Sequence, residues 1–168
     1  MGSEQVSDSE QVSDFWLYDQ HVPCYGMYRG LPYKIVKTPN GRMTSWRLDP
    51  ETGGWESVNH CIMEILFANY NIDWDTEEDY VEYPVSREEF ILEAERLRDR
   101  HGHGDETIRV MYEAANAILA KAKAEGREPT PEEQEQELEF IIRRKTFVMF
   151  EEKLQREGHP GADPSVAD

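Results

Sequence analysis

The sequence is short of basic residues and of long apolar runs, and each shortage excludes a class of protein. Its 168 residues hold 18 Lys and Arg against 35 Asp and Glu, a formal net charge of −17 with histidine neutral. A chain this acidic repels phosphate groups, so we expect no direct nucleic-acid binding. No stretch approaches about 18 uninterrupted apolar residues, so we expect no membrane-spanning helix and no membrane partner.

Cysteine is equally scarce, since only Cys24 and Cys61 are present. Residues 1–8 carry neither the basic start nor the apolar run of a secretory signal, so we expect a cytoplasmic protein with two reduced thiols. His21 and His60 lie near these cysteines, and the four residue types suit zinc. Adjacent helical residues point about 100° apart, so His60 and Cys61 are poorly placed to share one ion. We therefore expect no metal and no other cofactor.

The acidic residues are unevenly distributed along the chain. Residues 1–14 carry four acids and no base, and residues 61–83 carry seven acids and no base. Residues 84–168 carry twenty acids against thirteen bases, whereas residues 15–60 carry five bases and four acids. The first segment also repeats the six residues SEQVSD, and such biased composition predicts a disordered acidic tail at 1–14.

Residues 24–56 predict a small antiparallel sheet. Tyr33–Lys37 and Met43–Leu48 are rich in β-prone residues, and the Asn40-Gly41 pair between them is a strong hairpin signal. A further turn signal at Asp49–Gly54 extends the pattern, so we expect a meander of two or three strands. So few strands are only marginally stable alone, and the meander must therefore pack against an apolar surface.

The rest of the chain predicts helices. Cys61–Ala68 is apolar at seven of eight positions, which favours a buried helix over a central strand. Capping and stop residues delimit helices within Ser86–Gly102, Asp105–Gly126 and Thr130–Gly158. The connection between the last two helices is short, which predicts an antiparallel helical hairpin.

These elements predict an α+β fold, with a small N-terminal antiparallel β-meander packed against a C-terminal region of three to four α-helices. We expect a single domain over residues 15–157, with the meander at about 24–56 and the helical region at about 57–157. Glycine and proline are frequent in residues 158–168, which predicts a flexible C-terminal tail.

The acidic run after residue 72 is the main candidate binding segment. Its alternating acids are similar to the start of a calcium loop, but Glu78 and Pro84 occupy the positions that require glycine and a bidentate glutamate. Aromatic residues interrupt the carboxylates, which favours docking of a basic protein partner. The predicted partner-binding residues are Asp73, Trp74, Asp75, Glu77, Glu78, Asp79, Tyr80, Glu82 and Tyr83.

The last predicted helix carries a wide apolar stripe. Phe140-Ile141-Ile142 recurs seven residues later as Phe147-Val148-Met149, and three adjacent helical positions span about 200°. Either this helix is central in the fold, or it contacts a second chain through Phe140, Phe147 and Phe150. In the same helix, Glu139 and Arg143 have the i, i+4 spacing of an ion pair.

Two further patterns favour structural roles over chemistry. The aromatic residues between Phe15 and Trp55 could line a groove, but a small sheet needs them for its core. His101 and His103 follow a predicted helix end, where the helix dipole favours a histidine. No nucleophile or acid can be placed beside them, so we assign no catalytic residue.

The uneven acidity favours a non-enzymatic protein-protein interaction protein, such as an inhibitor, an immunity-type protein or an adaptor, with a basic partner. The alternative is a structural or assembly subunit that forms a homo-oligomer through its last helix. An enzyme or metal protein that uses the cysteine and histidine residues is a third class.

Overall fold

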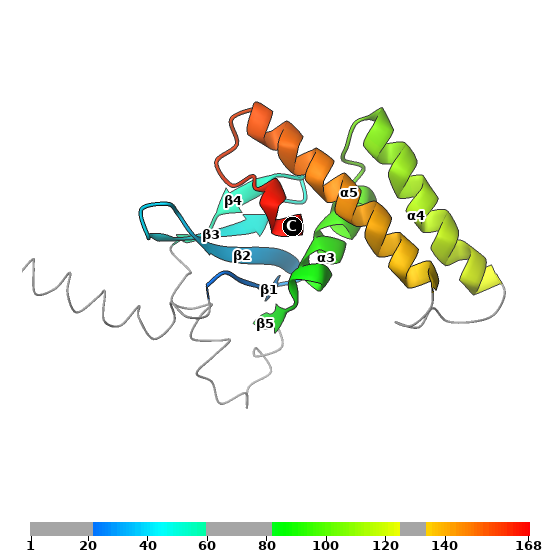
Figure 1. The fold of residues 1–168 in the computed structure, drawn as a ribbon, viewed down its shortest axis with the longest axis horizontal. Coiled ribbons are helices and arrows are strands. Elements are labelled where there is room, and N and C mark those ends of the chain that lie inside the picture. The colour runs from blue at the N-terminus through cyan, green and yellow to red at the C-terminus, as the bar shows by residue number, and fades with distance from the viewer. Residues whose placement is uncertain (1–21, 60–81, 125–133) are drawn as a thin grey trace, which may run out of the picture.

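The structure, a computed structural model, describes residues 22–59, 82–124 and 134–168 (Figure 1). A four-stranded antiparallel meander is followed by three helices that pack against it, which confirms the predicted α+β class. The elements in chain order are β1 Cys24–Tyr28, β2 Leu31–Lys37, β3 Met43–Leu48, β4 Trp55–Ser57, β5 Glu82–Val85, α3 Arg87–Arg100, α4 Glu106–Ala124, α5 Gln134–Arg156 and the short 3-10 helix η3 Pro164–Ala167.

A fifth strand extends the predicted meander. β5 pairs antiparallel with β1, and the strand order across the sheet is β4-β3-β2-β1-β5. β5 was not predicted, because a four-residue edge strand that contains Pro84 has little strand character of its own. Its pairing depends on a partner strand more than fifty residues earlier in the chain.

Two hairpins set the register of the meander. Arg29 and Gly30 join β1 to β2, and their φ angles of 52° and 77° are those of a two-residue type I′ turn. Between β2 and β3 the predicted Asn40-Gly41 hairpin is confirmed, but with a longer loop. Gly41 alone has a positive φ there, and the Thr38 backbone N–H donates to the Arg42 carbonyl at 2.8 Å.

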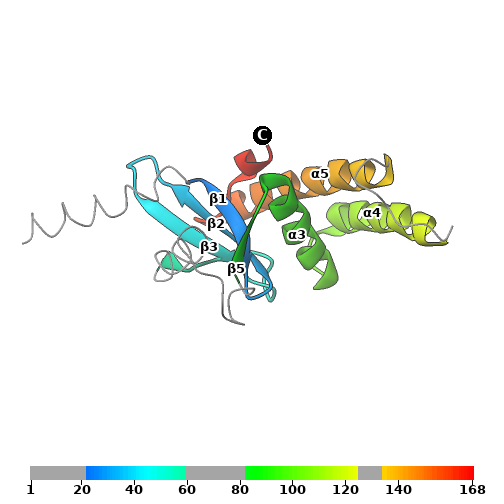
Figure 2. The same ribbon diagram turned by 90° about the horizontal axis from the view of Figure 1, so that it is seen from below.

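The helices are arranged in two layers beside the sheet. α3 contacts β1, β2 and α5, and η3 contacts α3 and α5, whereas α4 packs along α5 on the side away from the strands (Figures 1 and 2). The antiparallel hairpin predicted for α4 and α5 is present. α5 is therefore the central helix, with neighbours on opposite sides.

The predicted helix caps are observed where the structure describes them. The Ser86 hydroxyl accepts from the Glu89 backbone N–H at 3.1 Å before α3. The Asp105 carboxylate accepts from the Ile108 N–H at 2.9 Å before α4. The predicted start of the last helix at Thr130, the run Cys61–Ala68 and the acidic tail at 1–14 lie outside the described residues.

The main core lies between the sheet and α3 and α5, and Phe90 of α3 is at its centre. Ring centroids of Tyr25, Trp55 and Phe147 lie 4.8, 5.6 and 6.3 Å from that of Phe90. These contacts favour the core role predicted for the aromatic residues. Phe15, Trp16 and Tyr18 lie outside the described residues.

The C-terminal segment 158–168, predicted to be a flexible tail, is packed against the fold. The Lys34 ammonium donates to the Gly161 carbonyl at 2.6 Å, and the Arg144 guanidinium donates to the Ala167 carbonyl at 2.7 Å. η3 also buries Val166 and Ala167. The glycine and proline content predicted a flexible segment because it reflects only the local preference of the backbone. The long-range contacts, which composition does not reveal, hold the segment in place.

Candidate functional site

Four charged side chains are buried between the sheet and the helices. Lys34 of β2, Glu95 and Arg98 of α3, and Glu151 of α5 are each at most 1% exposed. We call these residues the inner cluster. Two positive and two negative groups balance one another, as buried charges must to remain ionised.

Arg98 of α3 connects its own helix to α5 and to the turn between β3 and β4. Its Nε donates to the Gly53 carbonyl at 2.8 Å, Nη1 to Glu95 at 2.9 Å and Nη2 to Glu151 at 2.7 Å. Its guanidinium carbon also lies 4.1 Å from the Phe150 ring centroid. All three nitrogens of this buried cation therefore have acceptors.

Glu151 connects the helical layer to the sheet and to the C-terminal segment. Its carboxylate accepts from the Trp55 indole N–H at 2.8 Å and from the Asp163 backbone N–H at 3.1 Å. The Lys34 ammonium lies 3.9 Å away and 4.6 Å from the Trp55 ring centroid. The inner cluster thus ties β2, β4, α3, α5 and the C-terminal segment together.

Burial shifts the ionisation of this cluster. Desolvation lowers the pKa of Lys34 to about 8, although the Glu151 charge opposes that shift. Desolvation raises the pKa of Glu95, and the Arg98 charge offsets part of the rise. None of the four residues lines either of the two pockets described below. Their evident role is to join the layers.

A second group of charges lies where α3 meets the α4–α5 hairpin. It consists of Arg96, Asp99, Glu139 and Arg143, and we call it the outer cluster. Arg96 binds Glu139 with two nitrogens, at 2.6 and 3.2 Å, and Arg143 Nε donates to the same carboxylate at 2.8 Å. The ion pair predicted between Glu139 and Arg143 is therefore confirmed.

The hydrogen bonds determine the ionisation of Glu139. Burial opposes loss of its proton, but hydrogen bonds from Arg96 and Arg143 outweigh burial and hold the pKa of Glu139 below its usual value. Asp99 is held separately, by the Arg109 guanidinium at 3.2 Å and the Asn116 amide at 2.8 Å.

A pocket of about 360 Å³ opens beside the outer cluster. It lies between α3, α4 and α5, and both acids and bases border it. We call it the Arg143 pocket; the residues that line it are Arg96, Asp99, Arg100, Asn116, Leu119, Glu139 and Arg143.

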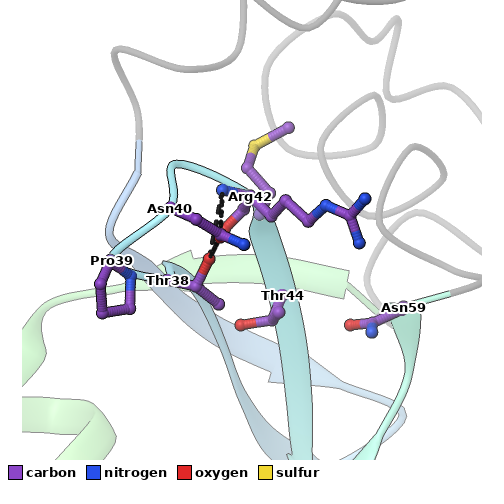
Figure 3. Close-up of a pocket in the computed structure, with 7 residues that line it drawn as sticks. Thr38, Pro39, Asn40, Arg42, Thr44 and Asn59 are labelled. Atoms are coloured by element: carbon purple, nitrogen blue, oxygen red, sulfur yellow. Dashed lines mark hydrogen bonds between the residues drawn. The ribbon is translucent and has the colours of Figure 1, made fainter.

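A second pocket, of about 600 Å³, lies beside the β2–β3 hairpin (Figure 3). Its polar side chains largely serve the hairpin itself. Thr38 donates to the Asn40 side chain, and the Asn59 side chain accepts from the Ser45 backbone N–H at 2.7 Å. The residues that line this pocket are Thr38, Pro39, Asn40, Arg42, Met43, Thr44 and Asn59.

Most of the predicted partner-binding segment is outside the described residues. This applies to Asp73, Trp74, Asp75, Glu77, Glu78, Asp79 and Tyr80. Glu82 and Tyr83 are described, and their backbone forms the start of β5, opposite Tyr28 and Met27 of β1. Partner binding by this segment remains a prediction.

The predicted self-association residues occupy different environments. Phe147 and Phe150 are buried in the core of their own chain, so a second chain cannot reach them in this structure. Phe140 is half-buried against the same core. The wide stripe is accounted for largely by the central position of α5, which was the first of the two explanations.

The cysteine and histidine residues do not meet in the described part of the chain. Cys24 is buried, whereas His21, His60 and Cys61 lie outside that part. His103 Nε2 lies 2.7 Å from the Pro50 carbonyl and is thus paired with backbone. Within residues 22–59, 82–124 and 134–168, no group of three or more His, Cys, Asp or Glu side chains is placed to hold a metal ion.

The inner cluster was missed by the sequence analysis, although a signal existed. Glu95 and Arg98 fall on the same helical face as the apolar residues Ile91 and Ala94, and α3 buries all four. A charged pair on an apolar face indicates buried ions, but the positions of Lys34 and Glu151 opposite it depend on tertiary structure.

Comparisons of the chain with protein-family models, curated proteins and solved structures give no significant match. No helix among the described residues has the length and apolar character needed to cross a bilayer. The functional proposals below therefore rest on the residues and their geometry.

Proposed function

We propose that this protein is a non-enzymatic interaction protein of the cytoplasm that binds a basic protein partner through acidic residues 73–83. The observation that carries the proposal is the separation of charge within the chain. Residues 15–60 hold five basic and four acidic side chains, a net charge of +1. Residues 1–14 and 61–83 hold eleven acidic side chains and no basic one.

Internal pairing supports this division of roles. The buried acids Glu95, Glu139 and Glu151 all accept hydrogen bonds from arginines of the same chain. Such carboxylates are neutralised locally and contribute little to the attraction of a partner. By contrast, residues 60–81 contain six acids and no base, so their sequence offers no internal countercharge. The excess acidity is thus available for long-range attraction.

The sheet also gives the acidic segment two fixed attachment points. β4 ends at Ser57 on one edge of the sheet, and β5 begins at Glu82 on the opposite edge. Four strand spacings of about 4.8 Å separate these edges by about 19 Å. The described residues of the core and of both ion clusters all lie outside residues 73–79, which makes the proposal testable by substitution in this segment.

The test begins with affinity capture from the native host at low and at physiological salt, followed by association kinetics with the purified partner. A variant that neutralises the segment should associate at least about tenfold more slowly at low salt, and its rate should depend less on salt. This variant carries D73N, D75N, E77Q, E78Q and D79N.

A matched control removes five exposed acids from the described part of the chain. It should retain most of the association rate, because its charges are scattered over the fold. Equal effects of the two variants, or a rate that is indifferent to salt, would contradict the proposal. The control substitutions are E51Q, E106Q, E113Q, E152Q and E157Q.

Self-association through α5 is the second candidate, and a different observation favours it. Leu138 and Ile141 lie three positions apart on α5 and are 46% and 42% exposed. A second chain can contact these two side chains, whereas Phe147 is buried. Light scattering at high concentration distinguishes the candidates, since a strict monomer excludes self-association, and L138D should dissolve an oligomer that forms through this face.

A further inference from the structure

The tip of the β2–β3 hairpin contains an asparagine that is followed by glycine. The sequence has five asparagines, and only Asn40 precedes a glycine, Gly41. Both residues are exposed at this tip. A glycine carries no side chain to shield its backbone nitrogen, so that nitrogen can approach the side-chain amide of the preceding asparagine. The reactive atoms of this pair are therefore open to solvent.

Hydrogen bonds hold the Asn40 side-chain amide in a defined position. Its Oδ1 accepts from the Thr38 hydroxyl and from the Arg42 backbone N–H, the latter at 3.4 Å (Figure 3). A side-chain oxygen that accepts from the second N–H along the chain folds its amide back over the residue between, here Gly41. The Asn40 amide carbon, Cγ, is thus turned toward the Gly41 nitrogen.

The same two donors match the charge that develops during an attack within the hairpin. When the Gly41 nitrogen attacks Asn40 Cγ, negative charge builds up on Oδ1, the atom that already faces both donors. Donors aimed at a developing oxyanion lower the barrier to such an addition. In the closed turn the Gly41 N–H donates to the Thr38 carbonyl at 2.9 Å, so this hydrogen bond must open before the attack. Exposed backbone hydrogen bonds at a hairpin tip open readily.

We propose that Asn40 is a site of spontaneous modification, at which Gly41 converts the asparagine to aspartate and isoaspartate through a cyclic imide. Water removes the proton of the Gly41 N–H as the new N–Cγ bond forms. The Cγ–Nδ2 bond then breaks, and Nδ2 takes up a proton and leaves as ammonia. A further water molecule opens the imide at either carbonyl and restores the N–H. One water is consumed and one ammonia is released, so the reaction needs no oxidant and no cofactor.

The products change both the charge and the backbone of the hairpin. Either product adds one carboxylate to the tip, next to the exposed residue Arg42. Isoaspartate also inserts a methylene group into the main chain before Gly41. This insertion displaces the Thr38 N–H from the Arg42 carbonyl, which are 2.8 Å apart in the unmodified hairpin, and it reshapes the pocket that the hairpin lines.

The test is incubation of the full chain for several weeks at neutral and at mildly alkaline pH. Peptide mapping by mass spectrometry follows each asparagine through the gain in mass when –NH2 is replaced by –OH, and chromatography separates isoaspartate from aspartate. Conversion at Asn40 should be at least about tenfold faster than at Asn59 or Asn116. It should be faster at the alkaline pH, because the Gly41 nitrogen must lose its proton.

Asn59 and Asn116 are internal controls, because their side chains form hydrogen bonds within the fold and neither precedes a glycine. Equal conversion at the three asparagines, or no conversion at Asn40, would overturn the proposal. This comparison uses the parent protein alone, so it does not depend on whether any variant folds.

A pair of glycine variants tests the attacking nitrogen. G41A should slow conversion at least about tenfold, because its methyl group hinders the attack. G30A is the matched control, since Gly30 and Gly41 both lie in hairpins with positive φ angles, 77° and 84°, and both have open space where a Cβ would be added. G30A should leave the rate at Asn40 unchanged, and equal effects of the two variants would overturn the proposal.

A pair of variants at Thr38 tests the donor to Oδ1. T38V keeps the shape of the side chain but removes the hydroxyl, and it should slow conversion at Asn40 about fivefold. T38S keeps the hydroxyl and should convert at the parent rate. A T38V rate equal to or above that of the parent would show that the hydroxyl gives no assistance and would overturn this part of the mechanism.

Discussion

The inner and outer clusters contain the same pair of residue types, arginine and glutamate, but their arginines differ in how completely they are hydrogen-bonded. In each, an arginine pairs with a glutamate on its own helix, Arg98 with Glu95 and Arg143 with Glu139. Arg98 also meets the Gly53 carbonyl of the β3–β4 turn, and all its nitrogens have acceptors. The described hydrogen-bond and ion-pair partners of Arg143 all lie on helices, and one of its nitrogens lacks a hydrogen-bond acceptor among the described residues.

The difference shows what the sheet contributes. Gly53, Trp55 and Lys34 complete the hydrogen bonds of the inner cluster from the strand side. These bonds stabilise the contact between the sheet and the helices, and every nitrogen of Arg98 has an acceptor within the chain. Among the described residues, the members of the outer cluster all come from helices, and one nitrogen of Arg143 has no hydrogen-bond acceptor. Replacement of single residues should therefore be far more damaging in the inner cluster.

The largest effect is expected for R98M. It leaves Glu95 and Glu151 buried without their shared cation, which should lower the free energy of unfolding by about 4 kcal/mol. Urea denaturation measures the change. R47M, which breaks the partly exposed pair with Glu56, is the control and should cost less than about 1 kcal/mol. Similar values for the two variants would contradict the special role of burial.

Lys34 should make stability increase with pH. Its pKa is about 8 in the folded chain and 10.5 in its ordinary state. Below about pH 8 both states hold the proton, whereas between pH 8 and 10.5 the unfolded chain alone still holds it. Stability should therefore rise through this window, by about 3 kcal/mol in total at 1.36 kcal/mol per pKa unit.

Comparison with K34M isolates this contribution. The other alkaline groups titrate in both proteins, so the parent should gain stability relative to K34M when urea denaturation is repeated from pH 7 to pH 10. A constant difference between the two proteins over this range would show that the ammonium is not desolvated in the folded state.

A smaller loss is expected for R143M in the outer cluster, about 2 kcal/mol. Glu139 keeps both hydrogen bonds from Arg96, and Asp99 keeps Arg109 and Asn116. The same denaturation experiment should place R143M between R98M and R47M. A loss equal to that of R98M would remove the distinction between the clusters.

The smallest effect among these buried positions is expected for Y112F. The Tyr112 hydroxyl donates to Glu95 at 2.9 Å, and burial raises the pKa of this tyrosine, so the donor stays protonated. Its removal should cost about 1.5 kcal/mol, since Arg98 still holds Glu95. Thermal and urea unfolding should agree on this value. No loss would indicate that Glu95 is satisfied by Arg98 alone.

Local signals predicted much of the fold. The Asn40-Gly41 hairpin and the Ser86 and Asp105 caps depend on neighbouring residues, and the structure confirms each of them. β5 was not predictable in this way, because its strand character comes from pairing with β1. The packed segment 158–168 was missed for the same reason, since its acceptors are used by distant side chains such as Lys34.

The candidate sites were less predictable than the fold. The spacing of Glu139 and Arg143 predicted their ion pair. The contacts of Arg143 with Asp99 and Asn116 could not be predicted from helical periodicity, because these residues belong to other helices. Lys34 lies between Tyr33 and Ile35, an alternation that usually places a lysine in solvent. Here both faces of β2 are buried, so the alternation instead directs Lys34 into the protein.

The bond from Lys34 to the Gly161 carbonyl spans 127 positions of the chain. Translation proceeds from the N-terminus, so the strands that carry this lysine are synthesised long before its acceptor exists. The ammonium can reach its final environment only after α3, α4 and α5 have emerged from the ribosome. Closure of the main core is therefore a late event in biosynthesis, and a nascent chain stalled before Gly161 would hold a sheet whose central cation has no carbonyl to bind.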